Sequence, residues 1–371
     1  VDVETICILV GMMLLVAVIK NSGIFEYIAI KAAKIAKGRP WPIMVIFILI
    51  TAVCSGMLDN VTTVLLVGPM TLAITNILKV DPVPYIITQI MASNIGGTAT
   101  LIGDPPNIMI GSAAKLGFVD FILNTGVATI FVIIVGLICM YFIYGRKLFV
   151  TDESIAKVMQ LDENKAIKDR KLMHESVIVI ILVALCFIFH DQLGVQSCTV
   201  AIAAACIMLL IGGQEPEEII ADVEWPTILF FIGLFIVVGG MKKVGVITML
   251  ANGLISITHG NMIVTMMVIL WVSAIVSSFL DNIPFVATLI PMILTMQAEG
   301  MDVAPIWWAL SLGACLGGNG TLIGASANVV LSGISKNNGH PITFGQYFKI
   351  GFPMMILSII VCSVFLLIRF A

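Results

Sequence analysis

The sequence predicts an all-α polytopic membrane protein made of two inverted-topology repeats, each with a re-entrant hairpin and a broken transmembrane helix. Hydrophobic residues make up 60% of the 371 residues and charged residues only 11%, unlike the composition of a soluble domain. Apolar stretches long enough to cross a bilayer recur along the chain. The second half also repeats the polar and glycine motifs of the first half in the same order.

Composition excludes several classes of protein. The mean hydropathy is +1.12, and the net charge is only −3. Since no basic block is present, we expect no binding of nucleic acid. The eight cysteines lie almost entirely in apolar segments without metal-ligand spacing, so we expect no cofactor. No nucleophile-base pair is visible either, which makes a membrane enzyme the least favoured class.

The repeat is defined by four matched motifs. Asp2-Val3-Glu4 matches Asp222-Val223-Glu224, and Leu58-Asp59-Asn60 matches Leu280-Asp281-Asn282; Gly96 to Gly103 matches Gly317 to Gly324, and Asn107 matches Asn328. The matched positions are polar or glycine residues that a lipid-facing helix does not favour, which argues against coincidence. We therefore divide the chain into repeat one (1–145), a linker (146–173) and repeat two (174–371).

Both repeats contain the same elements in the same order. These are a span (4–20 and 226–242), a short helix (23–37 and 245–258), an apolar segment that ends at Leu-Asp-Asn (41–57 and 262–279), a second apolar segment (64–78 and 284–297), an interrupted segment, and a final span (120–145 and 345–369). Two further spans, 176–192 and 195–213, precede the matched part of repeat two. Nothing equivalent precedes Val1, so we expect repeat one to lack its first two helices here.

The Asp-Asn pair of each repeat lies between two apolar segments. We interpret each pair of segments as a re-entrant hairpin with Asp-Asn at its tip; the alternative is two full spans joined by an exposed turn. The interrupted segments begin Gly-Gly-x-x-Thr-Leu-Ile-Gly and continue to Asn107 or Asn328. Irregular backbone at membrane depth is tolerated only where protein buries it or it lines a cavity. We therefore predict two broken helices.

Charge predicts the orientation of the repeats. The 146–173 linker carries seven Lys or Arg residues, so we expect it on the cytoplasmic side of the plasma membrane. With the hairpins counted as non-crossing, the 23–37 helix lies on the same side as the linker, and Lys31, Lys34 and Lys37 agree with this. The 245–258 helix then lies on the opposite side and has no Lys or Arg. The two repeats are thus predicted to be inverted.

Two motifs carry a resemblance to a known family. Leu58-Asp59-Asn60-Val61-Thr62-Thr63 and the stretch from Asn94 to Asn107 closely resemble the ion transporter superfamily, in the branch of ArsB arsenite permeases, NhaD sodium/proton antiporters and the melanosomal P protein. The resemblance covers nearly the whole chain. It implies a scaffold domain and a transport domain of two hairpins and two broken helices, with elevator-like movement between them. Sodium-coupled carboxylate transporters of this superfamily have Ser-Asn-Thr tips, so the Asp-Asn tips here disfavour dicarboxylate transport.

Three acids are expected at mid-membrane depth without a basic partner: Asp59, Asp104 and Asp281. Each buried carboxylate costs roughly 2.5–3.5 kcal/mol on insertion scales, which implies a proton, a bound cation or a wet cavity. Capping of a half-helix is the structural alternative. The candidate binding residues are Asp59, Asn60, Thr62, Thr63, Asn94, Gly96, Gly97, Thr98, Thr100, Asp104, Asn107, Asp281, Asn282, Gly317, Gly318, Asn319, Thr321, Ser326 and Asn328.

The neutral candidates have structural alternatives too. Amide oxygens of Asn60 and Asn282 suit sodium, but asparagines can equally bridge a hairpin to a broken helix. Glycines free backbone groups for binding, or allow close helix packing. Threonine hydroxyls can bind a ligand, or bond back to their own helix.

Three functions remain open from the sequence. The first is a proton- or sodium-coupled permease for a small ion, oxyanion or neutral hydroxide of the arsenite type. The second is sodium/proton antiport, and the third is a channel-like anion pathway. Expected partners are the lipid bilayer, the transported and coupling ions, and a second copy of the chain in a homodimer.

Overall fold

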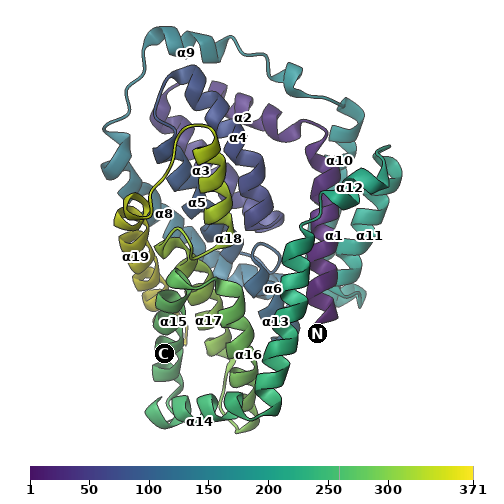
Figure 1. The fold of residues 1–371 in the computed structure, drawn as a ribbon, viewed down its shortest axis with the longest axis vertical. Helices are drawn as coiled ribbons and strands as arrows, with labels where there is room; N and C mark the ends of the chain where they lie inside the picture. The colour runs from purple at the N-terminus through teal and green to yellow at the C-terminus, as the bar shows by residue number, and fades with distance from the viewer. Residues whose placement is uncertain (259, 371) are drawn as a thin grey trace.

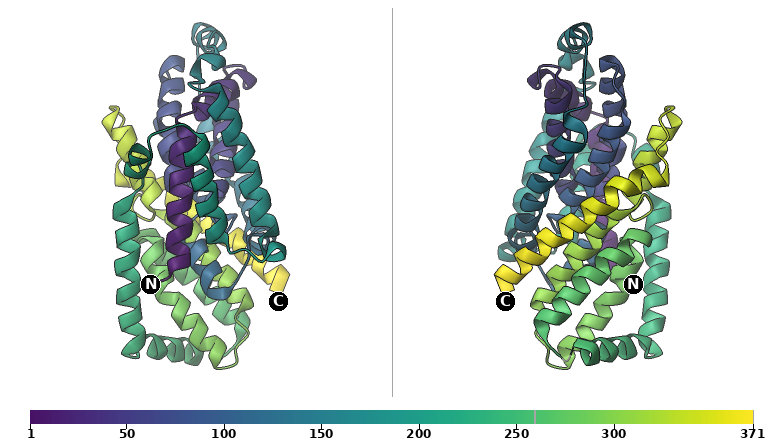
Figure 2. Two further views of the ribbon diagram at one scale, coloured as in Figure 1. Left: turned by 90° about the vertical axis from the view of Figure 1, so that its right-hand side faces the viewer. Right: turned by 90° about the vertical axis from the view of Figure 1, so that its left-hand side faces the viewer.

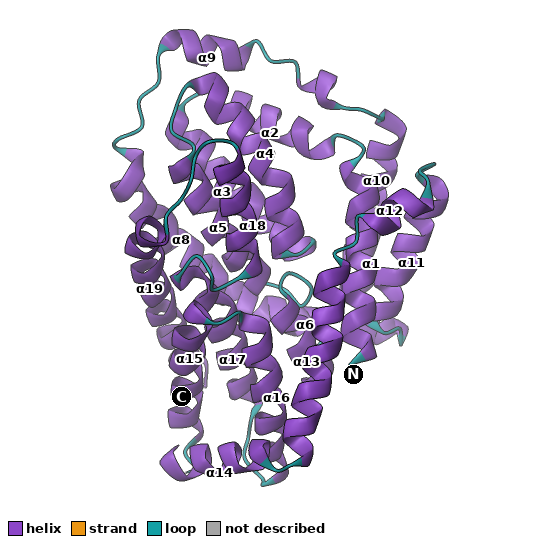
Figure 3. Cartoon of the chain, in the orientation of Figure 1, coloured by secondary structure: helices purple, strands orange, loops and turns teal. Residues whose placement is uncertain are grey.

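A computed structural model describes residues 1–258 and 260–370. Within these residues every regular element is helical (Figure 3). Eight of the described helices are long and apolar enough to cross a membrane. This confirms the predicted all-α polytopic class.

Repeat one ends in a broken helix and a long final span. Its elements are α1 (Val3–Lys20), α2 (Ile24–Ile35), α3 (Pro40–Met57), α4 (Asn60–Leu78), α5 (Val83–Thr98), α6 (Pro105–Ala114), α7 (Phe118–Phe121), η1 (Ile122–Gly126), α8 (Val127–Met140) and η2 (Tyr141–Gly145). The last four form one continuous helix. The helix contains two π-helical turns, η1 and η2, which the sequence does not predict.

The linker contributes two short helices, and repeat two follows the same order as repeat one. The linker elements are α9 (Asp152–Met159) and η3 (Glu163–Ala166). Repeat two comprises α10 (Arg170–Leu193), α11 (Ser197–Ile211), α12 (Pro216–Ala221), α13 (Trp225–Lys243), α14 (Val246–Thr258), α15 (Met262–Phe279), α16 (Asn282–Ala298), α17 (Ala304–Gly317), η4 (Gly318–Gly320), α18 (Ser326–Asn337) and α19 (Phe344–Phe370). Both helices that follow the Asp-Asn motifs begin at the asparagine.

The short helices of the two repeats lie at opposite ends of the molecule. In Figure 1 the linker helix α9 and the short helix α2 lie at one end, and α14, the repeat partner of α2, lies at the other. The final helix α19 crosses the bundle obliquely (Figure 2). This arrangement agrees with the predicted inversion.

The repeats interlock through their broken helices. Helix α3 packs on α5, and α15 packs on α17, so the first half of each broken helix lies against its own hairpin. The second halves do the reverse: α6 packs on α16, and α18 packs on α4. Each break therefore lies between the two repeats, where protein surrounds its irregular backbone.

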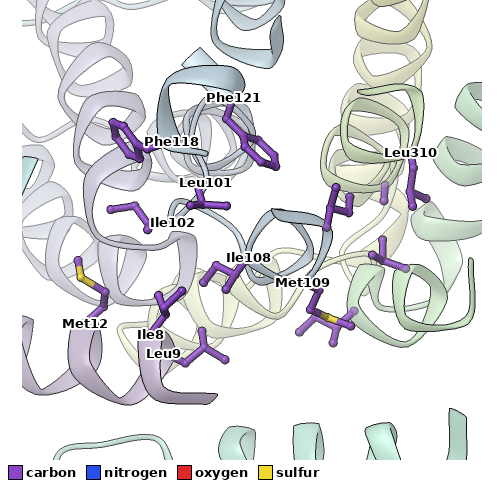
Figure 4. Packing of buried hydrophobic residues seen from close by; sticks show 14 of the residues in the cluster. Ile8, Leu9, Met12, Leu101, Ile102, Ile108, Met109, Phe118, Phe121 and Leu310 are labelled. Atoms are coloured by element: carbon purple, nitrogen blue, oxygen red, sulfur yellow. The ribbon is translucent and has the colours of Figure 1, made fainter. Parts of the chain in front are cut away.

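Apolar side chains seal the break of repeat one on the α1 side. Leu101 and Ile102 of the break lie near Ile8 and Met12 of α1 and near Phe118 (Figure 4). All five side chains are buried. Burial of these apolar side chains stabilises the loop against α1 and Phe118.

The linker is held against α2 by polar contacts. The Nζ atom of Lys34 lies 2.6 Å from Glu163 Oε2 and 3.1 Å from the carbonyl oxygen of Leu161. The backbone N–H of Lys168 donates to the carbonyl oxygen of Ser22 at 3.0 Å. Helix α9 also packs against α4. The linker thus connects the short helix α2 to the first hairpin.

Candidate functional site

The tips of both hairpins and the breaks of both helices meet in one polar cluster. Its most buried side chains have no exposed surface: Asn94, Asp104, Asn107, Asn319 and Asn328. Asn60 and Asn282, at the two tips, are 3% and 2% exposed. We call this set of seven residues the central cluster.

Asn107 and Asn328 brace the two breaks in the same way. The amide group of Asn107 donates to the carbonyl oxygens of Gly97, Thr98 and Thr100 at 3.3, 3.2 and 2.9 Å. That of Asn328 donates to Gly318 and Thr321 at 2.7 and 2.9 Å. These carbonyls have lost their helical partners at the break, so the asparagines satisfy them.

The same two asparagines link the repeats to each other. Asn107 Oδ1 accepts a hydrogen bond from Ser311 at 2.6 Å and lies 3.5 Å from the thiol of Cys315. Asn328 Oδ1 accepts one from Asn94 at 2.8 Å. Cys315 is the repeat equivalent of Asn94, so the two cross-repeat contacts are related by the internal symmetry.

The tip asparagines have different partners. Asn60 Nδ2 lies 3.4 Å from Asn94 Oδ1, whereas Asn282 Nδ2 lies 3.4 and 3.3 Å from the two carboxylate oxygens of Asp104. Both tips therefore bond to the broken helix of repeat one. Among the described hydrogen bonds, none joins Asn60 directly to Asn282.

Two of the three acids cap the second helix of their hairpin. Asp59 accepts hydrogen bonds from the backbone N–H of Thr62 at 2.8 Å and from the Thr62 hydroxyl. Asp281 accepts from the backbone N–H of Ile283 at 3.1 Å and from Ser326 Oγ at 2.9 Å. Capping, the structural alternative raised by the sequence, is thus observed for both.

Asp104 differs from the other two acids. It occupies the N-cap position of α6, but its carboxylate makes no capping bond. It is completely buried and points to Asn282 of the opposite repeat. None of the five ion pairs in the described part of the chain includes Asp59, Asp104 or Asp281. An unpaired buried carboxylate is costly, which makes Asp104 the strongest candidate for a proton or cation.

Most threonine candidates tie backbone segments together. Thr98 bonds back to the carbonyl oxygen of Asn94 at 2.6 Å. The hydroxyls of Thr100 and Thr321 bond to the carbonyl oxygens of Gly56 and Ser278, just before the hairpin tips. Thr63 has no hydrogen-bond partner among the described atoms.

The glycine candidates lie where helices touch. A Cβ atom on Gly96 would be 2.0 Å from the carbonyl oxygen of Ala52, and one on Gly317 would be 2.7 Å from that of Ala274. Gly97 and Gly318 face Gly103 and Gly324 of their own breaks. Close packing therefore accounts for these four glycines.

Sequence reasoning missed a set of serines that join each hairpin to its broken helix. Ser55 Oγ donates to the carbonyl oxygen of Ser93, and Ser277 Oγ donates to that of Ala314, both at 2.6 Å. Ser55 and Ser277 occupy equivalent repeat positions, a signal that could have identified them. Ser311 occupies a position with no polar counterpart in repeat one, so the repeat gave no such signal for it.

Comparison with known proteins identifies the family. The sequence model described as citrate transporter matches residues 1–313. The chain belongs to this family. It is similar to the uncharacterized transporter Rv2684 of Mycobacterium tuberculosis, with 42% identity over the whole chain and 87% of the relative. It is also 33% identical to the P protein of Homo sapiens over 99% of the chain, but spans only 54% of that protein.

Among solved structures, the chain is similar to the YdaH transporter of Alcanivorax borkumensis. The TM-score is 0.64 with 15% identity, and the match covers 97% of this chain and 84% of the other. At this identity the likeness concerns the fold alone. Together with the family match and the apolar helices, it shows a multi-pass membrane protein of the transporter type, and confirms the superfamily resemblance drawn from the hairpin motifs.

Proposed function

We propose that this protein is a secondary active transporter of a small ion or neutral hydroxide, coupled to protons or sodium through the central cluster. The main support is the environment of Asp104. This residue is completely buried at a helix break and contacts the hairpin tip of the opposite repeat without a cationic partner. A carboxylate in this position is stabilised by a bound proton or cation. Binding at Asp104 would affect both repeats, because Asp104 belongs to repeat one and its contact Asn282 belongs to repeat two.

The charge of the cluster favours certain substrates. Three acids lie at the tips and the break, and none of them forms an ion pair with a described base. Such a site suits a cation or an uncharged hydroxide, such as arsenous acid, better than a multivalent anion. Citrate, which the family's description names, would need neutralisation before it entered this cluster.

Buried oxygens without hydrogen-bond partners at the hairpin tip of repeat one favour sodium as the coupling ion. Asn60 Oδ1 and Thr63 Oγ1 are buried and have no hydrogen-bond partner among the described atoms. Neutral oxygens of this kind are ligands for hard cations. The same observation favours sodium/proton antiport as the second candidate function, with Asp104 taking the proton and the Asn60 tip taking sodium.

The interlocked repeats suggest how access alternates. We infer that α3–α4 and α15–α16 are re-entrant hairpins that approach the cluster from opposite membrane faces, with the linker on the cytoplasmic side of the plasma membrane. The hairpins and broken helices would move together, elevator-like, against a scaffold that includes α1 and α11. Support comes from the cross-repeat contacts, which hold α6 to α16 and α18 to α4 as one unit.

The test is solute flux in proteoliposomes with imposed proton or sodium gradients. Arsenite, chloride and citrate are tested as solutes, and proton release driven by sodium alone tests antiport. We expect uphill movement of a cation or of arsenite, driven by one of the two gradients. Purely downhill chloride current that no gradient can reverse would contradict the proposal and favour a channel.

A further inference from the structure

Unpartnered polar atoms gather in one part of repeat one. Of the seven buried side-chain oxygens that lack a hydrogen-bond partner among the described atoms, four belong to Thr51, Asn60, Thr63 and Gln89. These residues lie on α3, α4 and α5. An unsatisfied buried polar group costs about 1–3 kcal/mol. Such groups in native proteins are usually satisfied by ordered water, so their concentration at one place indicates hydration there.

Polar residues lie toward both ends of one face of α4, with the buried side chain of Val67 between them. Asn60, Thr63, Thr71 and Thr75 lie on one face of this helix, since they are three, eight and four residues apart. Gln89 of α5 donates its amide to Thr71 Oγ1 at 2.5 Å, and Thr71 Oγ1 donates to the carbonyl oxygen of Val67 at 2.8 Å. We call Thr51, Thr63, Thr71, Thr75 and Gln89 the polar seam.

Two cavities lie along the seam. The inner one has a volume of about 20 Å³ and is lined by Thr51, Val67, Thr71 and Gln89, with Phe25 of α2 among its apolar walls. This volume is enough for one water molecule, and because most of the wall is apolar, Thr51 and Gln89 would have to supply its hydrogen bonds. The outer cavity, of about 440 Å³, is lined by Thr75, Asn76, Lys79 and His340. It lies at the end of α4, the helix against which linker helix α9 packs.

Residues of the polar seam line both cavities, and the inner cavity is the one closer to the central cluster along α4. Thr75 lines the outer cavity and lies one helical turn from Thr71, which lines the inner one. Thr75 Oγ1 donates to the carbonyl oxygen of Thr71 at 2.8 Å. Two turns further along α4, Thr63 lies next to the Asn60 tip. Polar side chains thus lie at both ends of the path from the linker face to the cluster, and between them the carbonyl oxygen of Val67 accepts the hydrogen bond from Thr71.

Repeat two shows that packing does not require these polar groups. The repeat equivalents of Thr63, Thr71 and Gln89 are Phe285, Ile293 and Leu310. Ile293 and Leu310 are completely buried in the same kind of hairpin contact. At these three positions the same helix arrangement is built with apolar side chains in repeat two, whereas the equivalents of Thr51 and Thr75 are the polar residues Ser273 and Gln297.

We propose that the polar seam binds ordered water molecules between the central cluster and the linker face, along a path that repeat two interrupts with apolar residues at three of its five positions. In a proton-coupled cycle, each water would accept one proton from the outer side and donate one to its inner neighbour, and a carboxylate of the cluster would take the last. This role rests on the proposed function; the presence of the water does not.

Water binding is tested without transport. Wild type and Gln89→Leu, which introduces the residue of repeat two, are compared by cryo-electron microscopy in nanodiscs at a resolution that shows ordered water. We expect solvent density within about 3.2 Å of Gln89 Oε1 and Thr51 Oγ1, absent in the variant. A wild-type seam without solvent density, with Gln89 fully paired to protein atoms, would overturn the proposal.

The route is tested with matched variants. Gln89→Leu and Thr71→Ile, singly and combined, are compared with Thr88→Val, because the Thr88 hydroxyl already bonds to the carbonyl oxygen of Tyr85 at 2.8 Å. With protons supplied from the linker face, we expect the double variant to lower coupled flux roughly tenfold while its thermal stability is kept or raised. Equal flux in the double variant and Thr88→Val would overturn the route. If wild type shows no coupled flux, the proposed function fails. The presence or absence of water density then decides whether the polar seam binds water.

Discussion

Asn107 and Asn328 each use a single amide group to replace the hydrogen bonds that a helix loses where it breaks. Their oxygens also accept hydrogen bonds from the other repeat, at 2.6 Å from Ser311 and 2.8 Å from Asn94. These side chains therefore hold the shape of the breaks and join the repeats. These bracing contacts are the ones tested below, and the proposed ion site at Asp104 lies beside them.

Removal of either amide should destabilise the protein. Asn107→Ala leaves three buried carbonyl groups and Ser311 without their partner, and we expect the free energy of unfolding to fall by about 2–3 kcal/mol. The measurement is denaturant unfolding in detergent. Asn338→Ala is the control, because this exposed amide makes one bond, to the carbonyl oxygen of Ile334 at 2.9 Å. Similar losses in both variants would argue against the bracing role.

The sequence predicted the polar residues of the two hairpin tips, but not the residues that they contact. Asp59, Asn60, Asp281 and Asn282 were identified because polar residues recur at matched positions between apolar segments. The contact partners of these residues could not be predicted from the sequence. Asn282 bonds to Asp104, 178 residues away in the chain, and no helical period or spacing relates two such residues.

At the scale of the elements, helix bounds followed from hydrophobicity and from the repeat. Predicted segments 41–57 and 262–279 correspond to Pro40–Met57 and Met262–Phe279. The π-helical turns in the final span of repeat one were not predictable, because their cause is a local change in hydrogen-bond register that apolar sequence does not encode. Length alone also could not separate hairpins from spans, since α3 and α4 have 18 and 19 residues.

The contact between α3 and α5 depends on a glycine. Gly96→Ala would place a Cβ atom 2.0 Å from the carbonyl oxygen of Ala52, and backbone cannot yield as a flexible side chain does. We expect a loss of about 3 kcal/mol or more in the free energy of unfolding, measured as above. Gly136→Ala serves as the control, because a Cβ there would have no atom within 4 Å. Equal tolerance of both changes would contradict the packing described.

The linker contact should respond to acid. The hydrogen bond from Lys34 lowers the pKa of Glu163, so the ion pair favours docking above the ordinary glutamate pKa of about 4.3 and is lost as pH falls below it. We expect the protection of residues 152–166 against hydrogen exchange, measured relative to the intrinsic rate at each pH, to persist from about pH 7 to 5 and to fall below about pH 4. Lys34→Ala should show fast exchange already at neutral pH. Lys157→Ala, which removes an exposed pair within α9, should not.

At the scale of the whole molecule, the predicted inversion of the repeats would place α2 and α14 on opposite membrane faces. Cysteines at Lys31 and Asn252, both exposed, can be labelled in a background that carries Cys206→Ser. With a membrane-impermeant reagent added to sealed, uniformly oriented vesicles, we expect only Asn252→Cys or only Lys31→Cys to react from a given side. Reaction of both from the same side would contradict the inverted arrangement.

The most direct test of the account is uphill solute accumulation by wild type, Asp104→Asn and Asp59→Asn in proteoliposomes under a proton or sodium gradient. Asn keeps the shape of Asp104 and removes its charge, and Asn at position 59 can still cap α4. We predict that Asp104→Asn folds but loses accumulation at least about a hundredfold, whereas Asp59→Asn loses less than about threefold. Full accumulation by Asp104→Asn would contradict the claim that this buried carboxylate couples the two repeats to the driving ion.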